Sequence, residues 1–221
     1  MRVNVKAITV ASHECGHFRK LLLSCRRQGF EPTVLGMGAP FRGYGYRLKL
    51  LWQYVLNACA PEDLVVHCDA FDTVFAGDLA SLKLRFDALR VNLLVSAEKY
   101  CWPDAALAAT YPVCHTPYRY LCAGLWMGYV GAVLGVCDAL GVQSMPDCAD
   151  DQREFTRLYV TSRGLIQLDN DCVVFQNLHE SIGDLEFSGN ISNRVTGTRP
   201  VVFHGQGLTD MSGVLIHLGL A

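Results

Sequence analysis

The stretch LVVHCDAFDTVFAGD, residues 64–78, runs from an apolar segment into two aspartates that stand three residues apart. The apolar residues predict a buried strand over 63–69, and Asp69 and Asp72 follow at its carboxyl end. Aspartate is common in turns and helix caps, so one explanation of the pair is structural. The other is a functional site, because ligands of open α/β sheets bind beyond the carboxyl ends of the strands.

Strands and helices alternate around this stretch. Apolar runs predict further strands over 3–11, 30–36 and 91–98. Apolar residues at helical spacing predict amphipathic helices over 14–29 and 47–60, which separate the first three strands. This alternation predicts an α/β fold with a mostly parallel central sheet that helices cover on both faces.

The second half of the chain has a less regular pattern. It predicts a loop over 101–120, a strand leading into a helix over 121–140, a helix over 150–160 and a hairpin over 164–177 that turns at Asn170. A final strand over 199–207 reaches His204. No internal repeat, low-complexity tract or linker interrupts the sequence, which predicts a single domain over 1–221.

The composition narrows the class of protein. Of the 221 residues, 51% are hydrophobic and 18% are charged, which predicts a substantial core rather than disorder. The formal net charge of −2 disfavours binding driven mainly by phosphate contacts, although a local groove could still hold nucleic acid. The ten cysteines are scattered and form no CxxC pair, so we expect reduced thiols that fill the core rather than a disulfide framework.

The same sequence predicts a location for the protein. The N-terminal residues enter a strand-like pattern without the apolar segment of a signal peptide. No apolar run reaches the roughly 18 residues of a membrane span. These patterns predict a cytoplasmic protein with no membrane partner.

Several acidic residues and one histidine stand where a sheet would bring them together. Asp69 and Asp72 follow one strand, His204 ends another, and Asp150 and Asp151 open a helix. Two carboxylates and an imidazole suit a divalent cation such as Mn²⁺, which completes its shell with substrate phosphates. A lone histidine after a strand is more often structural, so the spacing leaves both explanations open.

Other catalytic motifs are missing from the sequence. The glycines GMG and GYG, near residues 36–45, lack the GxGxxG order of a dinucleotide site. The sequence has no GxxxxGK[ST] or GxSxG segment and no predicted helix carries a whole HExxH motif, which argues against P-loop, serine hydrolase and zinc protease functions.

Eight segments in chain order carry a resemblance: ITVAS (8–12), FRGYGYRLKLL (41–51), VVHCDAFDTVF (65–75), VSAEKYCWPD (95–104), RYLCAGLWMGY (119–129), ADDQREFT (149–156), LDNDCVVFQNL (168–178) and VVFHGQG (201–207). Together they resemble the glycosyltransferase domain of the procollagen lysyl hydroxylases and its relatives. SAE followed by CWP is the most specific of these strings. The resemblance implies a Rossmann-like fold of GT-A type and a metal-dependent enzyme that uses UDP-sugars.

The resemblance also implies roles for individual residues. Asp69 and Asp72, the DxxD motif, would hold Mn²⁺ (or Mg²⁺) together with His204. Six further residues would contact the UDP-sugar donor: Val10, Ser12, Arg47, Phe71, Gly124 and Gly205. Phe71 would lie against the uracil. The catalytic side would comprise Trp102, which shapes the sugar and acceptor pocket, and Asp150 and Asp151, which would contact the sugar or activate the acceptor.

Three departures from the family pattern bear on donor and acceptor identity. Cys122 and Ala123 replace an Asn-Ser pair and remove polar groups from the sugar side. Arg47 replaces a lysine, which keeps the charge but changes its geometry. Asp210 stands where relatives often have a cation.

Three functions follow from the resemblance and these departures. The first is transfer of a hexose, glucose or galactose, from a UDP-sugar to a hydroxylysine peptide. The second is the same transfer to a hydroxymethylated base in DNA, as phage and viral enzymes perform, which would need a basic groove built from Arg26, Arg27, Arg42, Arg47, Lys49 and Arg119. The third is a non-catalytic module that binds nucleotide sugars. The donor sugar, the stereochemistry of transfer and the oligomeric state are left open.

Overall fold

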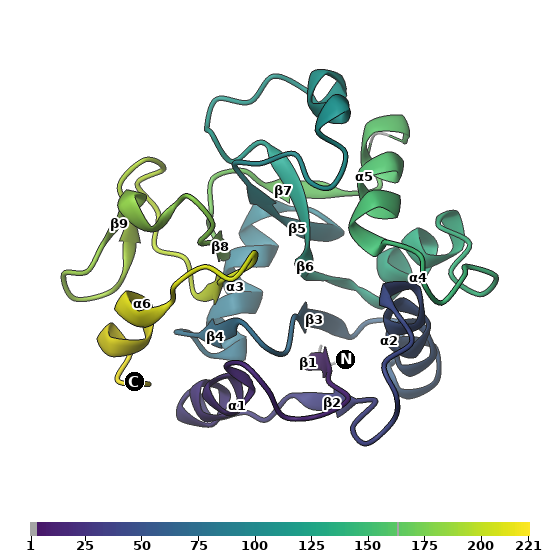
Figure 1. Ribbon diagram of the computed structural model, residues 1–221, viewed down its shortest axis with the longest axis horizontal. Helices are drawn as coiled ribbons and strands as arrows, with labels where there is room; N and C mark the ends of the chain where they lie inside the picture. The colour runs from purple at the N-terminus through teal and green to yellow at the C-terminus, as the bar shows by residue number, and fades with distance from the viewer. Residues whose placement is uncertain (1–3, 163) are drawn as a thin grey trace.

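The computed structural model describes residues 4–162 and 164–221, and within them a six-stranded sheet forms the centre of the molecule (Figure 1). Its strands lie in the order β2 (Thr33–Leu35), β1 (Val5–Val10), β3 (Leu64–Cys68), β6 (Tyr120–Tyr129), β5 (Leu93–Glu98) and β7 (Gln167–Asp169). Strand β6 is antiparallel to both of its neighbours, and the other pairs are parallel. The mostly parallel sheet predicted from the sequence is therefore confirmed.

Helices cover both faces of this sheet. On one face lie α2 (Tyr44–Ala58), α4 (Val130–Ala139) and α5 (Asp151–Thr161), and on the other lie α1 (Phe18–Arg27) and α3 (Leu79–Leu89) (Figure 1). Val65 of β3 packs into the first core and its neighbour Val66 into the second. Successive side chains of a strand point to opposite faces, so a strand buried on both sides reads as the continuous apolar run seen in the sequence.

A smaller sheet positions the histidine that the sequence singled out. Strand β11 (Val202–His204) lies between β4 (Thr73–Phe75) and β8 (Phe175–Asn177). His204 is paired in register with Thr73 on one side and with Asn177 on the other. This pairing brings the end of β11 next to Asp72, which directly precedes β4.

The remaining elements extend this smaller layer. Strands β9 (Leu185–Glu186) and β10 (Ser192–Asn193) pair with each other, and α6 (Ser212–His217) packs beside β4 and β11 near the C-terminus (Figure 1). Short 3₁₀ helices occupy Ala105–Thr110 and Ile182–Asp184. None of the helices among the described residues is long and apolar enough to cross a membrane.

The hairpin predicted over 164–177 is wrong. Strand β7 pairs with β5 in the central sheet, whereas β8 pairs with β11 in the smaller sheet. The chain does turn after Asp169, because the buried Asp169 carboxylate accepts hydrogen bonds from the backbone N–H groups of Val173, Val174 and Phe175. These bonds satisfy donors that a hairpin would have used, and they direct the chain into a second sheet.

The sequence patterns left two helices, α3 and α6, unassigned, and they predicted the environment of most of the cysteines. Helix α3 buries only Leu82 and Phe86, so its apolar periodicity is short, although Asp78 caps it by accepting a hydrogen bond from Ser81 N. All ten cysteines are free, and six of them are buried: Cys25, Cys68, Cys101, Cys122, Cys137 and Cys172. The expectation of reduced, core-filling thiols is confirmed for these six.

Candidate functional site

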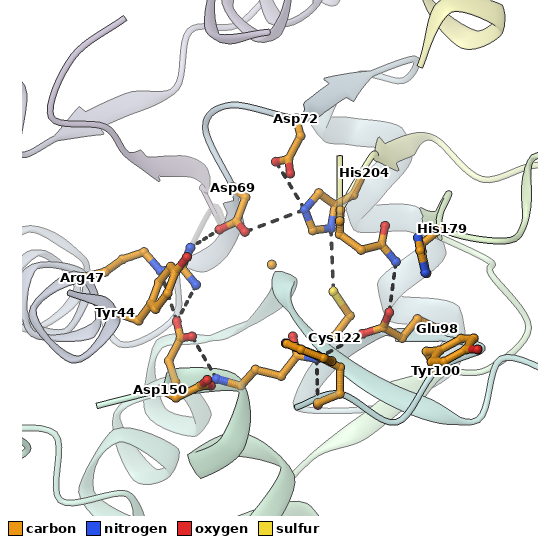
Figure 2. Close-up of a pocket in the computed structure, with 16 residues that line it drawn as sticks. Tyr44, Arg47, Asp69, Asp72, Glu98, Tyr100, Cys122, Asp150, His179 and His204 are labelled. Atoms are coloured by element: carbon orange, nitrogen blue, oxygen red, sulfur yellow. Dashed lines mark hydrogen bonds and ion pairs between the residues drawn. The ribbon is translucent and has the colours of Figure 1, made fainter. Parts of the chain in front are cut away.

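A cleft of about 440 Å³ opens at the carboxyl ends of β3, β5 and β11 and at the start of α5 (Figure 2). Eight of the residues predicted from the sequence line it: Arg47, Asp69, Asp72, Trp102, Gly124, Asp150, Asp151 and His204. The position is the one expected for an open α/β sheet, where strand ends leave a crevice.

Three of these residues form a group that can hold a metal ion. One ligand atom from each of Asp69, Asp72 and His204 lies within 4.8 Å of the others. His204 Nε2 is 3.7 Å from Asp69 Oδ2 and 3.3 Å from Asp72 Oδ1. The group is assembled by the β3 end, the turn before β4, and the register between β4 and β11.

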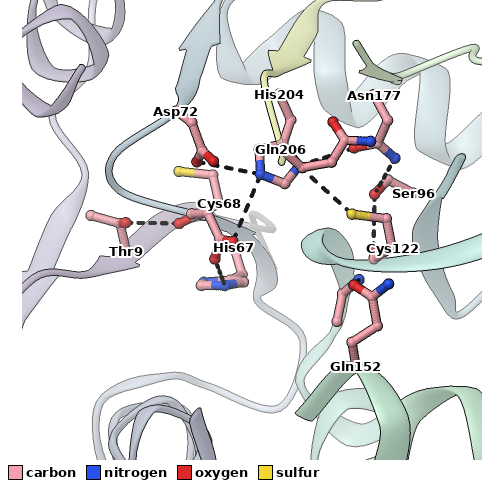
Figure 3. Close-up of polar contacts among 12 residues, drawn as sticks. Thr9, His67, Cys68, Asp72, Ser96, Cys122, Gln152, Asn177, His204 and Gln206 are labelled. Atoms are coloured by element: carbon pink, nitrogen blue, oxygen red, sulfur yellow. Dashed lines mark hydrogen bonds and ion pairs between the residues drawn. The ribbon is translucent and has the colours of Figure 1, made fainter. Parts of the chain in front are cut away.

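A chain of hydrogen bonds behind His204 fixes which of its nitrogens faces the carboxylates (Figure 3). Asn177 donates through Nδ2 to Ser96 Oγ (3.0 Å) and Ala97 O (2.9 Å), so its amide oxygen is directed to His204. His204 Nδ1 lies 3.0 Å from that oxygen and donates its hydrogen to it. The opposite nitrogen, Nε2, is buried and has no hydrogen-bond partner among the described residues. An imidazole nitrogen held in this way is typical of a metal ligand.

The charges of the group fit a cation. Burial opposes protonation of His204, yet the charge of Asp72 raises the His204 pKa well above its ordinary value. A proton on Nε2 and a divalent cation are thus alternative ways to balance the two carboxylates. One nitrogen and two carboxylate oxygens are a donor set that Mn²⁺ accepts, and that leaves positions for further ligands.

Arg47 of α2 connects one of the candidate metal ligands, Asp69, to Asp151 at the start of α5. Its buried guanidinium donates to Asp69 and to Asp151, with Nε 3.1 Å from Asp151 Oδ2, and it lies 4.9 Å from the centre of the Tyr44 ring (Figure 2). Burial alone would raise the pKa of Asp69, but the Arg47 charge holds that pKa well below its usual range. Asp69 is therefore an anion in this setting. Its second oxygen, Oδ2, faces His204.

The three residues predicted to be catalytic all line the cleft, and each also has a structural contact. The Asp150 side chain caps α5 by accepting a hydrogen bond from Arg153 N (2.9 Å), and Asp151 pairs with Arg47. Trp102 is 65% exposed, and its backbone carbonyl accepts a hydrogen bond from Gln152 Nε2 (3.0 Å). Their catalytic roles stay predictions.

The two predicted glycines differ in position. A Cβ atom on Gly124 would lie 2.3 Å from His204 Cε1 and 2.9 Å from Asp69 Oδ2. Only glycine therefore leaves room for these two candidate metal ligands. Gly205 is not part of the cleft lining, but its N–H donates to Asp72 O (2.7 Å). Gly205 therefore holds the Asp72 turn against the end of β11.

Three residues predicted to contact the nucleotide, Val10, Ser12 and Phe71, are not among the residues that line the cleft. Phe71 is half-buried, with its ring centre 5.7 Å from that of His13 and 6.5 Å from that of Phe18. Ser12 Oγ is within hydrogen-bond distance of His13 Nδ1 (2.9 Å), and Val10 ends β1. Contacts of Val10, Ser12 and Phe71 with a nucleotide stay predictions.

Sequence reasoning missed a buried carboxylate in the cleft. Glu98 ends β5 with 4% of its surface exposed, and it accepts hydrogen bonds from Gln152 Nε2 (3.1 Å) and Gln206 Nε2 (3.2 Å). Burial raises the pKa of Glu98 above its ordinary value. The signal was available, because Glu98 ends an apolar strand just as Asp69 follows one.

The basic residues that a DNA groove would need do not line the cleft as a group. Of Arg26, Arg27, Arg42, Arg47, Lys49 and Arg119, only Arg47 lines the cleft. Lys49 and Arg42 both pair with Asp147, and Arg26 pairs with Glu31. The cleft itself is lined by five carboxylates: Asp69, Asp72, Glu98, Asp150 and Asp151.

Comparison with known proteins gives a consistent match along the chain. The family model described as the PLOD GT domain matches residues 1–218. The procollagen-lysine,2-oxoglutarate 5-dioxygenase of Drosophila melanogaster is 32% identical over 225 residues, which cover 93% of this chain and 31% of that protein. A multifunctional procollagen lysine hydroxylase and glycosyltransferase of Caenorhabditis elegans is 29% identical, covering 90% and 30%. The human multifunctional procollagen lysine hydroxylase and glycosyltransferase LH3 is 30% identical, covering 92% and 30%. The chain thus spans about three tenths of the length of these relatives.

Proposed function

Since this chain belongs to the PLOD GT domain family, we propose that it is a metal-dependent glycosyltransferase that moves a hexose from a UDP-sugar to a hydroxyl acceptor. The observation that carries the proposal is the group of Asp69, Asp72 and His204, with the unpartnered Nε2 of His204 directed at the two carboxylates. The printed names of two relatives, which include glycosyltransferase, support the same class of reaction.

In this proposal the three residues hold Mn²⁺ or Mg²⁺. The bound cation would neutralise charge on the diphosphate of the donor, so that UDP departs without a proton transfer. Asn177 keeps His204 in the tautomer that presents Nε2, and Arg47 keeps Asp69 ionised and oriented. Both residues prepare the site before a ligand arrives, which lowers the cost of binding.

The donor would lie across the cleft from the nucleotide side to the sugar side. Val10, Ser12 and Phe71 would contact the uridine, with Phe71 against the base. Cys122 and Ala123 on β6 replace polar residues on the sugar side, and Cys122 lines the cleft. We propose that these two residues influence which hexose, glucose or galactose, is accepted.

We propose a hydroxylysine peptide as the acceptor. Five carboxylates and one arginine, Arg47, line the cleft, which favours a cationic side chain over a phosphate backbone as the acceptor. We propose that Glu98 accepts the proton of the acceptor hydroxyl, since burial raises its pKa toward the working range of a general base. Trp102, Asp150 and Asp151 would complete the sugar and acceptor contacts.

Product analysis tests the proposal directly. The protein is incubated with Mn²⁺ and a panel of UDP-sugars, and either hydroxylysine peptides or DNA that contains 5-hydroxymethylcytosine is added as acceptor. We expect mass spectrometry to find one hexose added to the peptide. Hexose on the DNA instead would overturn the acceptor assignment, and binding of UDP-sugar without any transfer or UDP release would indicate a non-catalytic module.

Asp72→Ala tests the metal site within the same assay. We expect loss of Mn²⁺-dependent turnover with an unchanged far-ultraviolet circular dichroism spectrum, because Asp72 is partly exposed and makes few structural contacts. Glu31→Ala is the matched control, since it removes an exposed carboxylate on the surface, outside the cleft. Full activity of Asp72→Ala in the presence of Mn²⁺ would contradict the assignment.

A further inference from the structure

A second pocket of about 330 Å³ opens at the opposite end of β11 from His204. It is formed by α3, the loop at 189–191, the residues that precede β11, and α6. Val201 lines this pocket, whereas His204, three residues further along, lines the cleft. The two sites share no lining residue, so the second pocket is separate from the proposed catalytic cleft.

The ionisable side chains of this pocket are all basic. Arg85, Arg199 and His217 line it, and none of the acidic residues in the described part of the chain does. In a chain with a formal net charge of −2, this is a local concentration of positive charge. Several other arginines are paired with carboxylates, as when Arg47 pairs with Asp69 or Arg153 with Asp104.

The two arginines of the pocket have donors to spare. Among the residues that the structure describes, neither Arg85 nor Arg199 forms an ion pair with a carboxylate. Arg85 is half-buried and uses one N–H on Val173 O (3.1 Å). His217 Nε2 lies 2.6 Å from Gly189 O, which ties the loop at 189–191 to α6 and holds the pocket wall in place.

We propose that this pocket binds an oxyanion group, a phosphate or a sulfate, either free or carried by a larger molecule. A guanidinium presents several N–H donors in a fixed fork that matches the oxygens of such a group. Asn190 adds an amide at the rim. The volume is at the lower end of the roughly 300–1,000 Å³ of small-molecule sites. The site needs no divalent cation, and it goes beyond the glycosyltransferase function.

Calorimetric titration tests the site without involving turnover. The protein is titrated with inorganic phosphate and with sulfate in the presence of EDTA, at constant ionic strength. We expect saturable binding of one equivalent, and about tenfold weaker binding in Arg199→Gln and in Arg85→Gln, because each variant loses one charge-assisted contact. Arg157→Gln, on the exposed face of α5, is the matched control and should bind as the wild type does.

Further arms separate the alternatives. Asp72→Ala should leave anion binding unchanged, and altered binding there would locate the anion in the cleft and overturn the proposal. Titration with glucose 6-phosphate and with a sulfated disaccharide distinguishes a carried group, which binds more tightly than the inorganic ion, from a free one.

Absence of saturable binding, or equal affinity in Arg199→Gln and wild type, would also overturn the proposal. Arg199 is exposed, so its variant is expected to fold. Hexose transfer is scored in a separate assay, so either proposal can fail alone.

Discussion

Strand β6 passes the proposed metal ligands at Gly124 with no space for a side chain. The hydrogen atom of Gly124 occupies the place where a Cβ would lie 2.3 Å from His204 Cε1. The backbone N–H of Asp69 also donates to Gly124 O (2.9 Å), so the backbone of β6 holds Asp69 in position. One residue thus sets both the room for the site and the position of one ligand.

Gly124→Ala is expected to weaken Mn²⁺ binding by at least tenfold, because the His204 ring or Asp69 must move to admit the methyl group. Binding is measured by electron paramagnetic resonance titration of free Mn²⁺ without any donor. Gly131→Ala on α4 is the control, since its Cβ would meet nothing within 4 Å and alanine favours a helix. Wild-type affinity in Gly124→Ala would show that crowding at this glycine does not govern the site.

A buried carboxylate at the end of β7, Asp169, holds the turn that leads into strand β8. Asp169 accepts backbone N–H groups from Val173, Val174 and Phe175, each at 2.8 Å, and so directs the chain from β7 into the smaller sheet. Two residues after Phe175, Asn177 reaches His204. The turn therefore supports the histidine through one short strand.

Asp169→Ala is expected to lower the free energy of unfolding by about 3 kcal/mol or more, since three backbone donors lose their acceptor in a buried turn. Urea unfolding followed by fluorescence gives the value. Asp171→Ala in the same turn removes a half-exposed carboxylate that meets His115, and should cost less than about 1 kcal/mol. Equal unfolding midpoints for the two variants would refute the role of Asp169.

At the level of the whole molecule, the cation site joins segments that are far apart in the chain. Asp69 follows β3 of the central sheet, Asp72 precedes β4 of the smaller sheet and His204 ends its β11. Arg47, which pairs with Asp69, adds α2. The two sheets contribute to one cleft, so a ligand held between them links their stabilities. Binding to the folded state alone must then raise the stability of the entire fold.

Mn²⁺ at a hundred times its dissociation constant should add about 2.7 kcal/mol to the stability of the protein. For a chain of this size, that corresponds to a rise of roughly 5–10 °C in the melting temperature, reversed by EDTA. Differential scanning fluorimetry measures the shift, and Asp72→Ala should abolish it. A shift of the same size in Asp72→Ala would mean that the ion stabilises the protein from another location.

Some of this molecule follows from local pattern. The apolar runs at 63–69 and 91–98 and the helical spacing over 47–60 were enough to predict the mostly parallel sheet and its helices, because burial on both faces imposes those patterns on any chain. The residues at strand ends, Asp69 and Asp72 above all, marked one edge of the sheet as the place of a site.

The rest was decided by pairing between distant strands. Periodicity does not reveal that β11 lies between β4 and β8, so it does not reveal that His204 meets Asp72 on one side and Asn177 on the other. Nor does it show that Glu98 is buried between two glutamines. Local sequence specifies which residues prefer a strand, a helix or a turn, but the neighbours of a side chain across a sheet depend on contacts that exist only after the whole chain has packed.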